Sequence, residues 1–255
     1  MSPKTLHRVR TIAARTLLVC APWLAISSLA HAHQVWLEPD GAGTKLYFGE
    51  FGDNLHEASP GYLDKLALIS ATVVSPKGEK VVESKKSSDG ITIAGRAAKG
   101  DSVVAVDLAY PLLENKEGGK TTKTAWTPAA RYVPELGPQQ PKLVLDVVPT
   151  NTTGEFQVVY RGAPLAKAEV SLVAVSGWSL TGNTDDKGKV SFKLPWKGTY
   201  ALLVRHKDAA PGKRKNAQGA DEAYDSSSYA TTLTFATSTG LPSPPAPPAA
   251  PPNKL

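Results

Sequence analysis

The sequence predicts an all-β protein, and three observations support that class. Short apolar and β-branched segments recur through residues 33–239, separated by turns that contain glycine and proline. No stretch of this region keeps a helical spacing of apolar residues over three turns. The alternation in Val190-Ser-Phe-Lys-Leu194 is typical of a strand with one buried face. We therefore expect a β-sandwich-like N-terminal region followed by a second β-sandwich module.

The N-terminal region is expected to cover residues 33–149. Its predicted strands lie at residues 35–37, 45–49, 66–74, 80–83, 90–94 and 102–109. Residues 110–140 are polar, glycine-rich and interrupted by prolines, which predicts a long loop of the kind that often carries function. A further strand over residues 142–148 closes the region.

The second module is expected to cover residues 150–239. Its predicted strands lie at residues 156–160, 168–175, 190–194, 199–205 and 231–235, joined by glycine-containing turns. Strands at this spacing indicate an immunoglobulin-like or transthyretin-like β-sandwich. Residues 240–255 are rich in proline and alanine, which predicts a disordered, extended tail.

Residues 1–32 have the features of a cleaved signal peptide. They contain four basic residues and no acidic residue, then an apolar stretch over 17–29, then the small residues Ala30 and Ala32. The apolar stretch is too short to span a membrane, so an uncleaved anchor is the less favoured alternative. We predict secretion to the periplasm and no transmembrane anchor in the mature chain.

Cleavage changes the charge and the cysteine content. Loss of the four basic residues lowers the formal net charge from +6 to +2, so the basic character does not indicate nucleic-acid binding. The chain has one cysteine, Cys20, and it leaves with the signal peptide. The mature protein is therefore expected to have neither disulfides nor thiolate metal ligands.

The predicted cleavage site creates a metal chelate. Cleavage after Ala32 makes His33 the first residue, and its free α-amine and imidazole can bind one ion. Cleavage after Ala30 instead leaves His31-Ala32-His33, in which amine, backbone amides and the third-position imidazole can wrap copper(II) or nickel(II) in a plane. Both processing sites stay open, and we favour the later one.

Two further histidines, His56 and His206, remain to complete the site. His56 lies in a polar segment after a predicted strand, and His206 ends another predicted strand. We predict a divalent transition metal, nickel or cobalt or copper, held by His33, His56 and His206. Carboxylates and a phenol in the same region are candidate further ligands or their hydrogen-bond partners: Glu50, Asp53, Glu57 and Tyr47.

The chain resembles a family of secreted bacterial proteins with a domain of unknown function. The resemblance lies in Ala-His-Ala-His33-Gln-Val-Trp-Leu37, Gly162-Ala-Pro-Leu-Ala166, Thr184-Asp-Asp-Lys-Gly188, Gly198-Thr-Tyr200 and Thr232-Leu-Thr-Phe235. This family resembles the periplasmic component of cobalt and nickel uptake systems. The resemblance implies metal capture or delivery rather than catalysis, a membrane uptake transporter as partner, and ligand roles for His33 and His206.

Two other functions are consistent with the sequence. The first is a copper oxidase or oxygenase built on the terminal histidine, with Trp36, Tyr47 and Trp126 as aromatic neighbours. The second is a module that binds carbohydrate or an envelope protein without metal, through the exposed side chains of Trp178 and Trp196. We expect a non-enzymatic metal-binding protein and keep the copper enzyme as the alternative.

Overall fold

The computed structural model describes residues 33–41 and 43–254 and confirms the all-β class. In this part of the chain the strands form three sheets and one two-stranded hairpin. The helices described are two short 3-10 turns, η1 (Phe51–Asp53) and η2 (Tyr62–Lys65). None of the described helices is long and apolar enough to cross a membrane. The predicted signal peptide, residues 1–32, lies outside the described residues.

A central sheet of nine strands contains segments from both predicted regions. Its order is β15 (Ser179–Asn183), β14 (Glu169–Ala174), β17 (Gly198–Asp208), β20 (Ser226–Thr237), β10 (Lys120–Tyr132), β8 (Ser102–Asp107), β4 (Ile69–Ser75) and β5 (Gly78–Val82), and β9 (Leu113–Glu117) pairs with β10. The pair β10–β20 is parallel, and the other neighbours are antiparallel. β20 therefore joins the early strands to the late ones within one hydrogen-bonded ladder.

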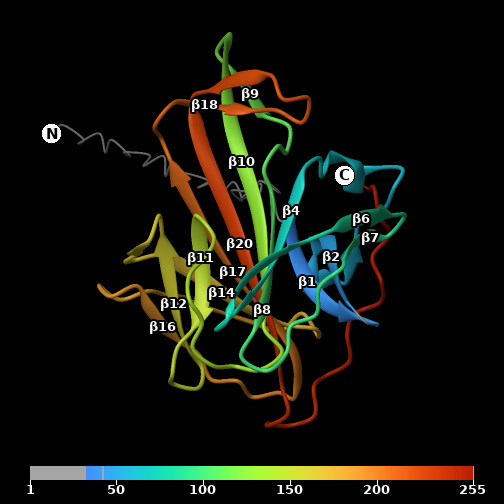
Figure 1. Ribbon diagram of the computed structural model, residues 1–255, viewed down its shortest axis with the longest axis vertical. Coiled ribbons are helices and arrows are strands. Elements are labelled where there is room, and N and C mark those ends of the chain that lie inside the picture. Colours follow the sequence, from blue (N-terminus) through green and yellow to red (C-terminus); the bar gives the residue numbers. More distant parts are fainter. Residues whose placement is uncertain (1–32, 42, 255) are drawn as a thin grey trace, which may run out of the picture. The chain divides into compact units, whose positions relative to one another are not determined.

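Two smaller sheets lie on opposite sides of the central strands (Figure 1). The N-terminal sheet has the order β1 (Gln34–Asp40), β2 (Gly43–Glu50), β7 (Gly90–Ile93) and β6 (Ser84–Ser87), with β3 (Leu55–His56) paired to β2. The four-stranded sheet consists of β11 (Leu145–Pro149), β12 (Glu155–Tyr160), β13 (Ala163–Pro164) and β16 (Lys189–Ser191). The described residues thus form three layers.

Alternation along β20 places its side chains in two separate cores. Ala230 belongs to a core with Leu37 and Phe48 of the N-terminal sheet. Leu233 packs on the other face, in a second core with Phe156 of the four-stranded sheet. Because successive strand residues point to opposite faces, one strand can build both cores.

Two neighbouring threonines of β20 link the three layers. Thr231 Oγ1 donates to the carbonyl of Leu145 in the four-stranded sheet, at 2.7 Å. Thr232 Oγ1 donates to the carbonyl of Val35 in the N-terminal sheet, also at 2.7 Å. Both threonines are 1% exposed, so each hydroxyl satisfies a carbonyl that water reaches poorly.

Replacing either threonine with valine is expected to lower the free energy of unfolding by about 1–3 kcal/mol, because a buried carbonyl loses its donor. Urea unfolding of Thr231→Val and Thr232→Val measures the change. Thr234→Val is the matched control, because the buried Thr234 Oγ1 has no hydrogen-bond partner among the described residues. That control should be neutral or stabilising. Equal losses in all three variants would contradict the assignment.

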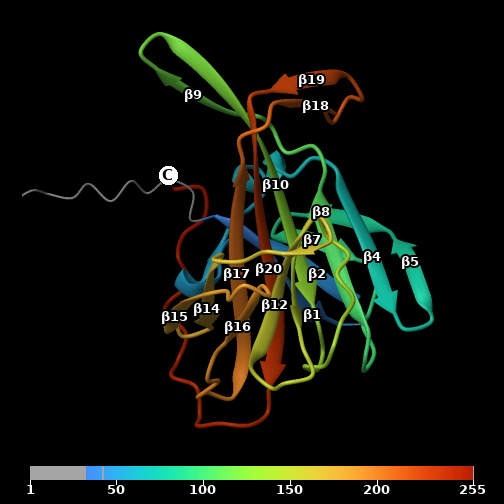
Figure 2. The same cartoon turned by 90° about the vertical axis from the view of Figure 1, so that its left-hand side faces the viewer.

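The segment predicted as a long loop, residues 110–140, is largely strand. The structure forms β9 and the thirteen-residue β10 there, and Figure 2 shows the β9–β10 ribbon extending beyond the sheet near the hairpin β18 (Gly212–Lys215)–β19 (Asp221–Tyr224). On one edge β10 pairs with β9 as far as Thr124 and with β8 from Ala129 onward. Pro128 lies between these two ladders, where a missing N–H is tolerated.

The predicted division at residue 150 falls between β11 and β12, which pair with each other. The described residues belong to one compact unit by their contacts, and strands from both predicted regions share the central sheet. The tail predicted as disordered over 240–255 also differs from expectation. In the described tail, Leu241 and Ala250 form bridges with Trp196 and Leu55, so the proline-rich chain is extended but docked.

Candidate metal centre

His33 immediately precedes β1, and its ring lies between two carboxylates. Its Nε2 is 2.6 Å from Glu57 Oε1, and its Nδ1 is 3.6 Å from Glu50 Oε1. The side chain of Glu57 is 1% exposed, that of His33 is 11% exposed and that of Glu50 is 22% exposed. The cluster is therefore largely shielded from solvent, with Glu50 as its most accessible member.

Pairing of β1, β2 and β3 brings these three side chains together. Gln34 pairs with Gly49, which sets the preceding His33 beside Glu50. The backbone N–H of Glu57 donates to the Phe48 carbonyl at 2.7 Å. This hydrogen bond holds the segment after β3 against β2. A Cβ on Gly49 would lie 2.1 Å from the Leu55 carbonyl oxygen. Glycine at this position therefore permits the close approach that delivers Glu57.

Aromatic side chains border the His33 ring. The ring of Phe48 lies 5.2 Å from it in an edge-on arrangement, and that of Tyr62 lies 6.1 Å away. Phe48 also contacts Tyr110 and Trp126, so this wall continues into the first core. Burial, with smaller effects from nearby negative charges including Glu57, raises the pKa of Tyr110 to about 12. Tyr110 therefore stays a neutral phenol at physiological pH.

The protonation of Glu50 depends on its neighbours. Burial raises the pKa of Glu50, and a hydrogen bond with Asp53 raises it further, whereas the charge of His33 lowers it. A positive charge placed beside a carboxyl group in this situation would stabilise its ionised form. The same side chain is the one that faces Nδ1 of His33.

The geometry leaves Nδ1 of His33 as the nitrogen suited to a metal. The short contact of Nε2 with Glu57 is the hydrogen bond that metal-bound histidines commonly donate to a carboxylate, and it fixes the tautomer. Two ligand atoms that are each about 2.1 Å from one ion are separated by roughly 3.0–3.6 Å. The separation between Nδ1 and Glu50 Oε1 fits that range. Chelation by the α-amine of His33 also requires Nδ1, because the two nitrogens then close one ring on the ion.

The described side chains do not by themselves form a group of three or more histidine, cysteine, aspartate or glutamate ligands. A metal at Nδ1 of His33 and at Glu50 therefore needs a donor that is not a side chain. The α-amine that the predicted cleavage after Ala32 would free is a candidate for that donor.

His56 does not join His33. It pairs with Gly49, and its ring contacts Trp36 at 5.1 Å and Tyr47 at 4.6 Å. Tyr47 and Phe48 point to opposite faces of β2, so His56 and His33 lie on opposite faces of the N-terminal sheet. Burial lowers the pKa of His56, which favours the neutral ring in this aromatic setting.

His206 is also separate, so the predicted three-histidine site is not formed. It lies on β17, two residues after Val204, and both face the four-stranded sheet. The His206 ring is 4.3 Å from that of Tyr160 on β12, whereas His33 lies on the N-terminal sheet across the central sheet. The separation has a simple cause: strand pleating sends the three histidines to three different faces.

The tryptophans expected to be exposed are half-buried. Trp178 and Trp196 pack against the second core and meet edge to face, with ring centroids 6.2 Å apart. Core packing therefore accounts for them, and a carbohydrate-binding surface loses its main support.

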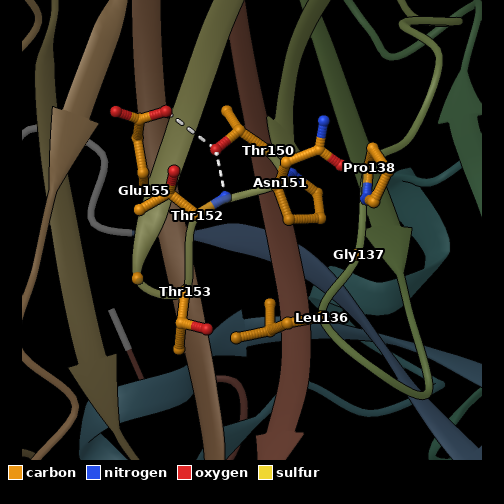
Figure 3. A pocket seen from close by; sticks show the side chains of 10 residues that line it. Leu136, Gly137, Pro138, Thr150, Asn151, Thr152, Thr153 and Glu155 are labelled. Carbon is orange, nitrogen blue, oxygen red and sulfur yellow. Dashed lines mark hydrogen bonds between the residues drawn. The ribbon is translucent and has the colours of Figure 1, made fainter.

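A cavity of about 220 Å³ lies beside the turn between β11 and β12, and none of the three predicted histidine ligands lines it (Figure 3). Its polar groups bond to one another: Thr150 Oγ1 donates to Glu155 Oε1 at 2.8 Å and accepts from the Thr152 N–H at 3.1 Å. Lys189 pairs with the same carboxylate at 2.9 Å. These contacts are those of a stable turn.

The fold and the site define an all-β protein with a histidine–carboxylate cluster on its N-terminal sheet. Residues 135–208 match the model of a family described as a domain of unknown function, DUF4198. The match includes the four-stranded sheet and β14, β15 and β17, but not His33, Glu50 or Glu57. No curated protein matches this chain. A domain of unknown function is thus found in the second half of the chain.

Proposed function

We propose that this protein binds a divalent transition metal in the periplasm and captures or delivers it without catalysing a reaction. The supporting observation is the His33 ring, which offers Nδ1 toward Glu50 while Nε2 is held by the buried Glu57. The α-amine of a processed His33 would add the third donor. Nitrogen donors with one carboxylate suit nickel(II), cobalt(II) and copper(II).

The proposed partner is a membrane uptake transporter for nickel or cobalt, as the resemblance in the sequence implies. The proposed site differs from the three-histidine site expected from the sequence, because His56 and His206 are replaced by the amine and Glu50. The proposal keeps the metal chemistry and changes the ligands.

Calorimetry with nickel(II) and copper(II) tests the proposal on protein that begins at His33. Acetylation of its α-amine is expected to weaken binding by about 10²–10⁴-fold, because a chelating donor acts at high effective concentration. His33→Ala should weaken binding at least as much. Mass spectrometry of the secreted protein establishes whether His33 is its first residue.

His206→Ala is the matched control, since that ring lies against Tyr160 on the far face. It should leave both affinities unchanged. The proposal fails if the acetylated protein binds as tightly as the free amine, or if His206→Ala weakens binding as much as His33→Ala.

A further inference from the structure

The C-terminal strap, residues 241–253, runs back from the end of β20 toward the N-terminal sheet (Figure 1, red). At its start, the Leu241 N–H donates to the Pro195 carbonyl at 2.8 Å, and the Lys197 N–H donates to the Leu241 carbonyl at 2.8 Å. Farther along, the Ala250 N–H donates to the Asn54 carbonyl at 3.1 Å. Asn54 Nδ2 in turn donates to the Pro247 carbonyl at 2.9 Å.

The end of the strap reaches the cluster of His33, Glu50 and Glu57 through Asn253. Its backbone N–H donates to Glu57 Oε2 at 2.7 Å, while the other oxygen of that carboxylate contacts His33. Its side-chain oxygen accepts from the Tyr62 N–H at 2.9 Å, and its side-chain nitrogen donates to the Pro60 carbonyl at 3.1 Å. One residue of the strap therefore makes three hydrogen bonds to the segment that carries Glu57.

The receiving turn is shaped for this residue. A Cβ on Gly61 would lie 2.1 Å from Asn253 Oδ1, so a larger side chain there would exclude the amide. Asn253 itself has φ +58°, a left-handed conformation that asparagine adopts more readily than most residues. The contact thus depends on the residue types at both positions.

The strap composition favours docking. Seven prolines between residues 242 and 252 restrict the free chain to extended conformations, which reduces the entropy lost on binding. Proline has no N–H, and the backbone N–H groups that bond the strap to the body belong to Leu241, Ala250 and Asn253. The donors therefore fall at the non-proline positions that meet the body.

We propose that the C-terminal strap closes over Glu57 and that Asn253 is a positioning residue for His33. By holding one oxygen of Glu57, it directs the other oxygen to Nε2 of His33 and keeps Nδ1 free for the metal. Strap docking and metal binding should then strengthen each other, since such coupling is reciprocal. The coupling rests on the proposed metal function, whereas docking of the strap does not.

The test compares native protein beginning at His33 with Asn253→Gly, which keeps the left-handed backbone and removes the side-chain amide. Ser243→Ala is the matched control, because that hydroxyl bonds only within the strap, to the Pro244 carbonyl. Amide hydrogen exchange at position 253 is measured without metal, and copper(II) affinity and dissociation rate are measured by competition. A chain ending at residue 239 gives the effect of removing the whole strap.

Asn253→Gly removes the two side-chain hydrogen bonds, to the Tyr62 N–H and the Pro60 carbonyl, that anchor residue 253 beside Glu57. We expect exchange at position 253 to speed up, because the backbone N–H that it donates to Glu57 is then held less firmly. We expect copper(II) binding to weaken about tenfold, the effect of loosening one hydrogen bond to a charged group. Copper(II) should dissociate faster from Asn253→Gly than from the native protein. The chain ending at residue 239 should bind copper(II) as weakly as Asn253→Gly or more weakly. Ser243→Ala should match the native protein in all of these measurements. Docking would be overturned if the amide at position 253 exchanged as fast in the native protein as in Asn253→Gly, whatever the copper(II) affinities are. The coupling alone would be overturned if the native amide exchanged slowly but Asn253→Gly bound copper(II) as tightly as the native protein. If no form binds copper, the metal function and the coupling fall together, and exchange still decides docking.

Discussion

Replacing Arg131 with methionine is expected to lower the free energy of unfolding by about 3–5 kcal/mol, because a buried carboxylate then loses its counter-charge. Arg131 on β10 and Asp146 on β11 are both fully buried, and Arg131 Nη2 lies 2.6 Å from Asp146 Oδ2. Further bonds hold the guanidinium at Ser102 Oγ and at the Gln140 carbonyl. The pair joins the central sheet to the four-stranded sheet, so its loss affects two layers.

Urea unfolding of Arg131→Met measures the effect. Lys99→Met is the control, since it removes the exposed pair with Glu135 and should change stability little. The double variant Arg131→Met/Asp146→Leu removes both charges and should recover much of the loss. A single variant as stable as Lys99→Met would show that the buried pair does not hold the layers.

Replacing Glu57 with leucine is expected to weaken copper(II) binding about 100-fold, and replacing it with glutamine about tenfold. Glu57 holds the Nε2 side of His33 at 2.6 Å and also accepts the Asn253 N–H. Leucine removes both acceptors and leaves the ring free to turn. Glutamine keeps an acceptor oxygen but loses the charge that makes Nδ1 a stronger donor.

Calorimetry on protein beginning at His33 gives both affinities, and circular dichroism checks that the variants fold. Glu114→Gln is the control, because Glu114 is exposed on β9 and far along the chain from the cluster. If Glu57→Leu bound copper(II) as tightly as the native protein, the orienting role of this carboxylate would be contradicted. The roles of the α-amine and the imidazole would still be decided by the acetylation experiment.

The strands that could be predicted are those whose apolar residues face a core. Alternation alone was not sufficient, because Val190–Leu194 alternates and yet β16 ends at Ser191. The positions of β1, β2, β8, β12 and β17 agree with the sequence pattern, because one or both faces of each meet a core. The pattern failed at β10, which begins with Thr and Lys and contains Pro128. Its partner β20 pairs from Ser226 onward, so its main stabilising neighbour is distant in the sequence.

The candidate site was predictable where its parts are close in the chain. Glu50 and Glu57 lie in one hairpin-like segment, and both were candidates beside His33. The faces of His56 and His206 could not be predicted, because they depend on which sheet packs on which side. Asn253 gave no signal either, since it follows a proline tract and bonds to Pro60 193 residues earlier.

The ladder between β17 and β20 has a consequence for the segment that matches DUF4198. That segment ends at Asp208, and all eleven residues of β17 pair with β20, which lies outside it. Cut out alone, the segment would expose β17 as a long, unprotected edge, and such edges recruit strands from other molecules. A fragment that ends at Asp208 is therefore expected to aggregate. Adding residues 226–237 covers the edge of β17 but exposes the edge of β20 that pairs with β10, so β10 is needed as well.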